Sequence, residues 1–178
     1  MPESAEQTRV WLQRVVVGLD LCPFARGPLQ AGRVRIAVSD ALDLAGALGD
    51  LGLECERLVG ADPEDLETTL VVYPNIFRDF GEFCHATLVA RDLLQKLGVE
   101  GVVQLADFHP DYVFADVPMD DPANATNRSP HPVWHLLRES SVGRAAASHP
   151  DIHGIPARNE QLLRGMHSDA LRDLLDPP

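Results

Sequence analysis

Apolar side chains recur at intervals of three and four residues in several long stretches of the chain. Trp11, Val15 and Leu19 show this spacing in the first stretch, and Leu163, Met166 and Leu171 occupy one apolar stripe near the end. Such spacing places apolar side chains on one face of a helix. The pattern predicts helices over residues 4–20, 40–58, 76–97, 131–147 and 156–175.

Three shorter stretches, residues 34–38, 68–73 and 101–106, are rich in β-branched and apolar residues and predict strands. Single predicted helices separate them, which is typical of parallel strands joined by right-handed crossovers. We therefore predict an α/β fold with a small, mainly parallel sheet of about three to four strands covered by helices. Three short strands do not fix their pairing, so a ferredoxin-like α+β arrangement is the alternative.

Proline-rich segments interrupt these elements. Pro23 ends the first predicted helix and leaves residues 21–26 as a tight loop. Residues 116–132 contain many prolines, aspartates and asparagines, which predicts a long loop. Loops of this length are uncommon in compact domains and often carry function.

The chain has 178 residues, of which 45% are hydrophobic, so we expect residues 1–178 to form one globular domain. The three cysteines are odd in number and widely spaced, which favours reduced thiols over a disulfide framework. The N-terminus lacks a signal-peptide pattern, and no apolar run is long enough to span a membrane. These features predict a soluble cytoplasmic protein.

The formal net charge of −12 argues against binding to nucleic acid or to anionic membranes. The charge is uneven, because residues 40–67 hold nine acids and one base, whereas residues 122–144 hold three arginines and one glutamate. A local cationic pocket in an acidic protein suits a small anionic molecule. The sequence has no Walker-type phosphate loop, and we expect no cofactor.

Polar side chains of the types used in catalysis and ligand binding are concentrated between Phe108 and Glu139. His109 follows the third predicted strand, and ligand sites in parallel sheets lie beyond the carboxyl ends of their strands. We therefore predict His109 as a general base, the alternative being a ring that bonds the loop backbone. The other candidates for binding or catalysis in this stretch are Tyr112, Asn127, Arg128, Ser129, His135, Arg138 and Glu139.

Cys22 is the cysteine with the clearest potential for catalysis. It lies in the loop after the first helix, and Arg26 four residues later would favour its thiolate form. The alternative is an inert buried thiol, which is common among free cysteines. Cys55 and Cys84 fall on predicted helices among apolar neighbours and are expected in the core.

Two histidines four residues apart, His131 and His135, would share one face of the predicted helix 131–147. With Cys22 and His109 they would complete a tetrahedral metal site, although a hydrogen-bonded pair is the alternative. Glu139 would share that face and orient His135.

Residues 127–132 would form an anion cradle at the N-terminus of that helix. They carry amide, guanidinium and hydroxyl donors, which suit a phosphate or a carboxylate. The alternative is that Asn127 and Ser129 shape turns while Arg128 pairs with an acid.

Residues 19–25 (LDLCPFA), 108–112 (FHPDY) and 126–132 (TNRSPHP), with 135–139 (HLLRE), resemble the bacterial family known as domain of unknown function 1415. The resemblance covers about residues 10–164 and implies no particular activity. The family usually has tyrosine at the position of His131, which argues against a metal site as a family property.

The leading hypothesis is a small enzyme, a hydrolase or group transferase, that acts on a small anionic substrate. Cys22 would be the nucleophile and His109 or His135 would transfer protons, while arginines at 26, 128 and 138 hold the anion. The alternatives are a non-catalytic anion- or metabolite-binding module and a metal-binding protein. All three hypotheses require one common cavity. The loop with Cys22, the strand end with His109 and the segment 127–139 would line it together.

Overall fold

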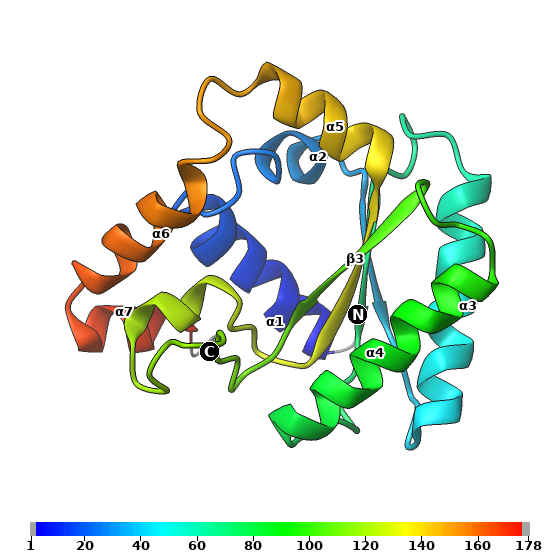
Figure 1. Cartoon of the computed structure of the whole chain (residues 1–178), viewed down its shortest axis with the longest axis horizontal. Helices are drawn as coiled ribbons and strands as arrows, with labels where there is room; N and C mark the ends of the chain where they lie inside the picture. The colour runs from blue at the N-terminus through cyan, green and yellow to red at the C-terminus, as the bar shows by residue number, and fades with distance from the viewer. Residues whose placement is uncertain (1–2, 176–178) are drawn as a thin grey trace.

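A four-stranded mixed sheet forms the centre of the computed structural model, which describes residues 3–175 (Figure 1). The ends of the predicted domain, residues 1–2 and 176–178, lie outside the described residues. The strands are β1 (Val34–Val38), β2 (Thr68–Val72), β3 (Val103–Phe108) and β4 (Val133–Arg138), in the order β1-β2-β4-β3.

The pairing of the strands combines both directions. β1 and β2 are parallel, whereas β4 runs antiparallel to β2 on one side and to β3 on the other. β1, β2 and β3 therefore point the same way, and the predicted α/β fold is confirmed. The ferredoxin-like alternative is wrong, because β1 and β2 are neighbours in a parallel pair.

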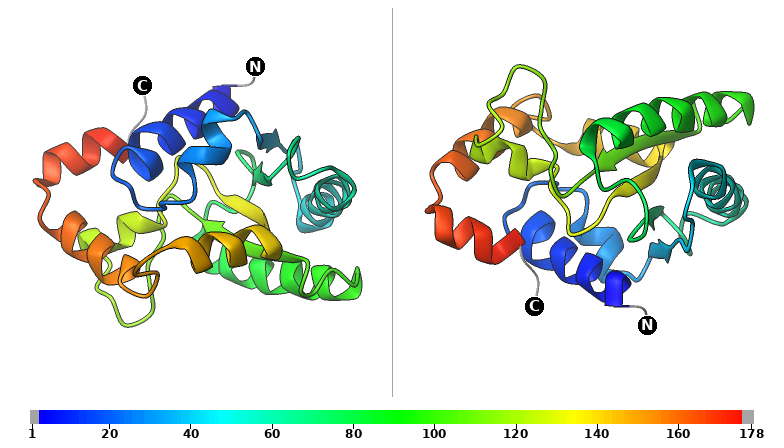
Figure 2. Two further views of the ribbon diagram at one scale, coloured as in Figure 1. Left: turned by 90° about the horizontal axis from the view of Figure 1, so that it is seen from above. Right: turned by 90° about the horizontal axis from the view of Figure 1, so that it is seen from below.

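Helices cover both faces of the sheet (Figures 1 and 2). α3 (Leu44–Gly60) and α4 (Phe80–Lys96) lie on one face, and α1 (Glu3–Trp11) with the π-helical η1 (Leu12–Val17) lies on the other. The remaining elements are α2 (Arg26–Gln30), the 3-10 helix η2 (Pro122–Thr126), α5 (Glu139–Ser148), α6 (Ile155–Arg164) and α7 (Ser168–Leu175).

Alternating side chains of the buried strand β2 divide the apolar interior into two cores. Val71 and the following Tyr73 pack with α3 and α4, whereas Leu70 and Val72 pack with η1 and with Leu163 of α6. Successive side chains of a strand point to opposite faces, so one strand supplies both cores. All five residues of β2 are buried.

The predicted helix 131–147 is wrong in its first half, because residues 133–138 form the central strand β4. The segment Val-Trp-His-Leu-Leu-Arg is a short apolar run, and periodicity alone does not separate a buried strand from a helix at this length. Its pairing with both β2 and β3 decides the outcome. Only residues 139–148 continue as a helix, α5.

Several predicted boundaries also move. α3 begins after Asp43, whose carboxylate accepts a hydrogen bond from the Gly46 amide at 2.8 Å, and not at Asp40. α4 begins at Phe80, after Asp79, and thus four residues later than the predicted start at residue 76. The last predicted helix is divided into two helices, α6 and α7, with a break after Arg164. The loop after Cys22 contains a short helix, α2, that was not predicted.

Candidate functional site

Strand geometry places His135 and Arg138 on opposite faces of the sheet. His135 lies beside Leu70 in the pairing of β4 with β2, and both contribute to the pocket described below. Side chains alternate along a strand, so a residue three positions later points the other way. The sequence had placed His131, His135 and Glu139 on one face of a helix. That predicted shared face is wrong, because residues 133–138 form a strand.

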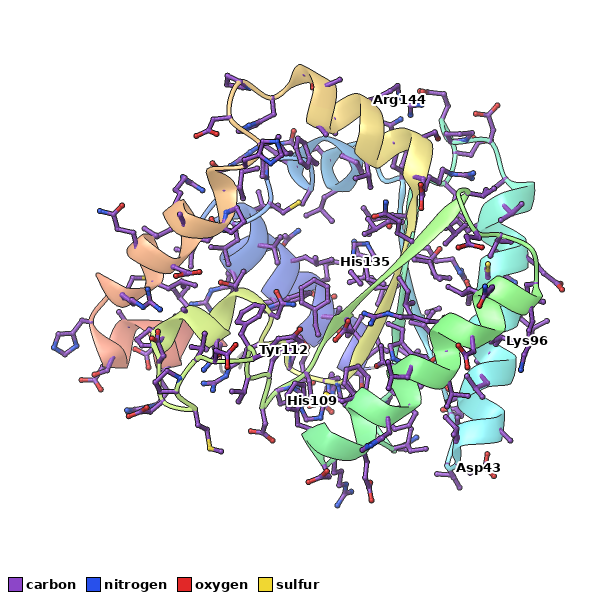
Figure 3. The ribbon with its side chains drawn as sticks, in the orientation of Figure 1. Asp43, Lys96, His109, Tyr112, His135 and Arg144 are labelled. Atoms are coloured by element: carbon purple, nitrogen blue, oxygen red, sulfur yellow. The ribbon has the colours of Figure 1, made fainter. Side chains whose placement is uncertain are left out.

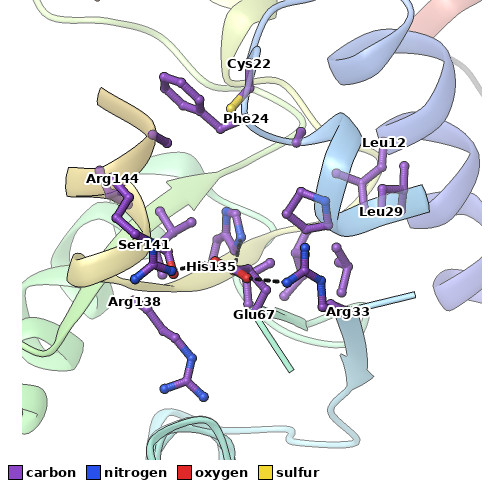
Figure 4. A pocket seen from close by; sticks show the side chains of 18 of the residues that line it. Leu12, Cys22, Phe24, Leu29, Arg33, Glu67, His135, Arg138, Ser141 and Arg144 are labelled. Atoms are coloured by element: carbon purple, nitrogen blue, oxygen red, sulfur yellow. Dashed lines mark hydrogen bonds and ion pairs between the residues drawn. The ribbon is translucent and has the colours of Figure 1, made fainter. Parts of the chain in front are cut away.

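A pocket of about 450 Å³ lies between the sheet, the loop that carries Cys22 and α5 (Figure 4). Most of its walls are apolar side chains, including Leu12, Phe24, Leu29, Val34, Leu70, Leu137 and Val142. Its polar and charged residues are Cys22, Arg33, Glu64, Glu67, Thr68, His135, Arg138, Ser141, Arg144 and Ser148. Two of the three predicted catalytic residues, Cys22 and His135, thus share one pocket.

The position of this pocket differs from the expected one. It lies near the first residues of β1 and β2, Val34 and Thr68, and near the last residues of β4. Because β4 runs antiparallel, its carboxyl end lies beside the amino ends of β1 and β2. The prediction of a site beyond the carboxyl ends of the first three strands is therefore wrong for this pocket.

The hydrogen bonds of Thr68 determine which nitrogen of His135 carries the proton. The Thr68 hydroxyl donates its proton to the carbonyl oxygen of Leu136 at 2.6 Å. The contact of 2.7 Å between Thr68 Oγ1 and His135 Nε2 therefore requires Nε2–H as the donor. This leaves Nδ1 as a free acceptor in the neutral ring.

The Nδ1 atom of His135 faces the pocket. No hydrogen bond within residues 3–175 uses this atom. Among these residues, the side-chain atoms that are fully buried and lack a hydrogen-bond partner are Trp11 Nε1, Arg33 Nε and Thr69 Oγ1. His135 Nδ1 does not belong to this group, because it is accessible from the pocket. Burial lowers the pKa of His135 to about 4, and the ring is neutral at pH 7.

We expect this histidine to make the folded protein less stable in mild acid. Its pKa is about 4 when folded and near 6.5 when unfolded, so the unfolded state binds more protons between these values. The free energy of unfolding therefore falls as the pH drops from about 6.5 to about 4. Urea unfolding of the His135→Gln variant at several pH values should show a flatter dependence than the wild type.

The matched control is His153→Gln, the same substitution at an exposed position. An NMR titration of the wild type gives a second measurement of the same property. A midpoint for His135 near 6.5 would contradict the prediction.

Cys22 carries a protonated thiol under ordinary conditions. Burial raises the pKa of Cys22, and the nearby Asp20 carboxylate adds to this effect. Hydrogen bonds from the backbone N–H groups of Phe24 and Ala25 to the sulfur act in the opposite direction but are smaller. The predicted help from Arg26 is not provided, because its guanidinium donates to the Val17 carbonyl oxygen at 3.1 Å.

Helix α6 holds the backbone just before Cys22. Arg158 donates to the carbonyl oxygen of Asp20 at 2.7 Å, and the buried Asn159 side chain donates to that of Leu21 at 2.7 Å. Asp20 adopts a left-handed conformation with φ of 55°. The position of the thiol thus depends on a helix near the end of the chain, which the sequence did not indicate.

Arginines and glutamates alternate along one side of the pocket. Arg33 lies 3.4 Å from Glu64 and 3.3 Å from Glu67, and Arg144 lies 4.0 Å from the other oxygen of Glu67. Arg144 also donates to Ser141 Oγ at 3.1 Å and keeps 64% of its side chain exposed. The pocket thus has cations at its rim, but neither Arg33 nor Arg144 was among the predicted ligands.

His109 lies outside this pocket, in the packed interior at the far end of β3 (Figure 3). Its side chain is 1% exposed, and its Nε2–H donates to the Phe77 carbonyl oxygen at 2.8 Å. Its Nδ1 accepts from the Asp111 amide at 3.0 Å. Both nitrogens are therefore used by the backbone, which is the alternative considered for this residue.

Most other predicted ligands build the loop before β4. Arg128 donates to the carbonyl oxygens of Tyr112 at 3.3 Å and Met119 at 2.9 Å. Ser129 Oγ donates to the His131 carbonyl oxygen at 2.6 Å, and the Asn127 side chain donates to that of Asp107 at 3.3 Å.

The expected anion cradle is not formed. The segment precedes a strand and not a helix, so no helix N-terminus stands behind it. The Tyr112 ring packs against Phe80 with centroids 5.0 Å apart, outside the pocket.

Arg138 and Glu139 have structural positions. The buried guanidinium of Arg138 donates to the carbonyl oxygens of Leu58, Ala61 and Leu66, where α3 ends. Its remaining side chain lines the pocket. Glu139 begins α5, and no hydrogen bond within the described part of the chain joins it to His135. The predicted orientation of His135 by Glu139 is therefore wrong.

The four residues of the predicted metal site are separated. The ring of His131 lies against Gln7, with Nε2 at 2.7 Å from the amide oxygen, and His109 is sealed in the interior. Across residues 3–175, no group of three or more histidine, cysteine or acidic side chains is placed to hold a metal ion. The alternative of a metal site built from Cys22, His109, His131 and His135 is therefore not supported by the fold.

The sequence indicated the pocket only in part. Cys22, His135 and part of the Arg138 side chain line it, whereas Arg26, His109, Tyr112, Asn127, Arg128, Ser129 and Glu139 do not. Four further residues line the pocket without having been predicted, namely Thr68, Arg33, Glu67 and Arg144. Thr68 had one available signal, because a hydroxyl at the start of a buried apolar strand needs a partner.

The fold and the pocket together define a small α/β protein with a single mixed sheet and a cavity of the size of a small-molecule site. The family model described as "Protein of unknown function (DUF1415)" matches residues 3–173, so the chain belongs to this family. This confirms the resemblance noted in the sequence.

No curated protein and no solved structure matches the chain. None of the helices within residues 3–175 combines the length and the apolar character required to cross a membrane.

Proposed function

We propose that this protein binds a small organic acid in the pocket beside His135. The observation that carries the proposal is the free Nδ1 acceptor of His135 in a pocket of about 450 Å³ with mainly apolar walls. Pockets of this size with a few placed polar groups are typical of small-molecule sites. A ligand with an apolar body and a hydrogen-bond donor would satisfy both features.

The acidic group of the ligand is proposed to pair with Arg144. Arg144 is largely exposed, and its ion pair with Glu67 at 4.0 Å is long, so its guanidinium is available to a ligand at the rim. Arg33 is held more closely, by Glu64 and Glu67. The arrangement therefore favours one anionic group at the rim over a multiply charged molecule in the interior.

A second candidate function is catalysis, as a hydrolase or group transferase. It is favoured by the presence of Cys22 in the same pocket, where the backbone N–H groups of Phe24 and Ala25 lower the pKa of its thiol in part. In this mechanism the thiol sulfur bonds to an electrophilic carbon of the bound ligand while the thiol proton passes to His135 Nδ1. The leaving group then takes that proton from the imidazolium.

Binding is tested by an NMR screen of the wild-type protein with aromatic and alkyl carboxylic acids that also carry a hydroxyl or amide N–H donor. We expect shifts of amides that surround the pocket, and weaker binding in His135→Leu. Arg144→Gln should reduce the affinity roughly fivefold, which corresponds to about 1 kcal/mol. The matched controls are His153→Leu and Arg172→Gln, at exposed positions outside the pocket.

The two candidate functions make different predictions for Cys22→Ser. A binding protein keeps its affinity and produces no change in the ligand, whereas an enzyme loses turnover and keeps binding. A screen in which no acid shifts the pocket amides, or in which His135→Leu binds as the wild type does, would refute the proposal.

A further inference from the structure

Strand β1 forms one edge of the sheet, and its outer side has unpaired backbone groups. The Arg33 carbonyl oxygen and the Ser39 amide both bond to the segment that contains β2. Alternate residues of a parallel strand bond to the same side, so Val34, Ile36 and Val38 direct their N–H and C=O groups outward. No backbone hydrogen bond of the described residues takes these outward groups.

A groove of about 490 Å³ runs along this edge. Ala5 of α1 lines it on one side, and Asp50, Leu53 and Arg57 of α3 line it on the other. Leu53 is 64% exposed, which is high for a leucine beside an open strand. β1 contains no proline or lysine, its pairing with β2 is continuous without a bulge, and the charge of its one basic residue, Arg35, is paired with Glu54. The edge is therefore weakly protected against pairing with another strand.

We propose that a second copy of this chain occupies the groove, with its β1 strand antiparallel to the first. A two-fold axis at Ile36 pairs Val34 with Val38 of the second copy, and Arg35 with Ala37 of the second copy. No like charges then stand opposite each other along the strands. The two four-stranded sheets become one continuous sheet with a self-complementary interface.

The charges of α3 favour this occupant. Arg35 holds Glu54 through two hydrogen bonds of 2.6 and 3.0 Å, which places Glu54 level with the centre of β1. Asp50 and Arg57 lie about one helical turn to either side of Glu54. In the two-fold arrangement the α3 helices are antiparallel, so Asp50 faces Arg57 of the second copy, twice in each dimer.

The apolar contact is supplied by the same segment of α3. Leu53 lies next to Glu54 and therefore close to the two-fold axis, where it meets Leu53 of the second copy. The groove wall formed by α3 is therefore self-complementary about the two-fold axis, because its acidic end faces the basic end of the second copy and its apolar centre faces the same apolar centre. A basic peptide strand would satisfy Asp50 but would place a like charge beside Arg57.

The oligomeric state of the full chain tests the proposal. Sedimentation equilibrium across the micromolar range should give twice the chain mass of 19.5 kDa for the wild type. Leu53→Glu should be monomeric, because two glutamates would meet at the axis. Leu88→Glu is the matched control, since Leu88 is 59% exposed on α4, away from this edge, and this variant should remain dimeric.

A charge exchange identifies the contact itself. Arg57→Asp should weaken the dimer at least tenfold, and the double variant Asp50→Arg, Arg57→Asp should restore it. Hydrogen exchange of the Ile36 and Val38 amides should slow as the protein concentration rises. A wild type that is monomeric throughout, or a dimer that survives both Leu53→Glu and Arg57→Asp, would overturn the proposal, whatever the pocket beside His135 binds.

Discussion

Replacing Arg138 by methionine is expected to lower the free energy of unfolding by about 3 kcal/mol. The guanidinium group donates to the carbonyl oxygens of Leu58, Ala61 and Leu66, and it is buried where α3 ends. Methionine fills a similar volume but donates no hydrogen bond, so buried carbonyl oxygens lose their partners. Urea unfolding followed by circular dichroism measures the change.

Arg144→Met is the matched control, because Arg144 has 64% of its side chain exposed and contacts the protein weakly. We expect a change within about 0.5 kcal/mol for this variant. Equal effects at the two positions would show that Arg138 does not hold the end of α3. The prediction also separates a structural arginine from an anion-binding one, since added phosphate should change the stability of the wild type and of Arg138→Met equally if Arg138 is structural.

Gly18→Ala is expected to destabilise the protein by about 2 kcal/mol through steric overlap. Gly18 follows the π-helix η1, and a Cβ atom there would overlap the carbonyl oxygen of Arg14. Relief of this overlap requires the end of η1 to shift, and the Cys22 loop follows directly. We therefore expect faster alkylation of Cys22 by iodoacetamide as well as a lower midpoint of urea unfolding.

The control for this substitution is Gly49→Ala in α3, where an added Cβ meets nothing within 4 Å. Alanine is a better helix former than glycine, so this variant should gain up to about 1 kcal/mol. The two substitutions are chemically identical and are expected to change stability in opposite directions. A neutral Gly18→Ala variant would mean that the π-helix relaxes without cost.

The sequence predicted much of the fold because local patterns determine most of its elements. Val34–Val38 and Thr68–Val72 have β-branched runs between turn residues, and both form strands as expected. β4 was missed because its strand character comes from its neighbours. Its apolar run has no distinct period of its own, and only insertion between β2 and β3 makes it a strand.

The candidate site was less predictable because it depends on that missed strand. Sequence spacing put His135 and Glu139 on one helix face, whereas His135 lies in strand β4 and Glu139 begins helix α5. His109 follows a parallel strand, as a catalytic residue often does, but its Nε2–H is hydrogen-bonded to the carbonyl oxygen of Phe77. Cys22 reaches the pocket because α6 holds its loop, a long-range contact that no local pattern indicates.

The position of β4 in the sheet has a consequence for folding during synthesis. Thr68 and Leu136, joined across β2 and β4, are 68 positions apart, and β3 contacts the rest of the sheet only through β4. β1, β2 and β3 therefore leave the ribosome before the strand that unites them. Until residue 138 emerges, the edges of β2 and β3 that pair with β4 have no partner strand. During this period we expect chaperones to bind the nascent chain, and premature release would favour aggregation.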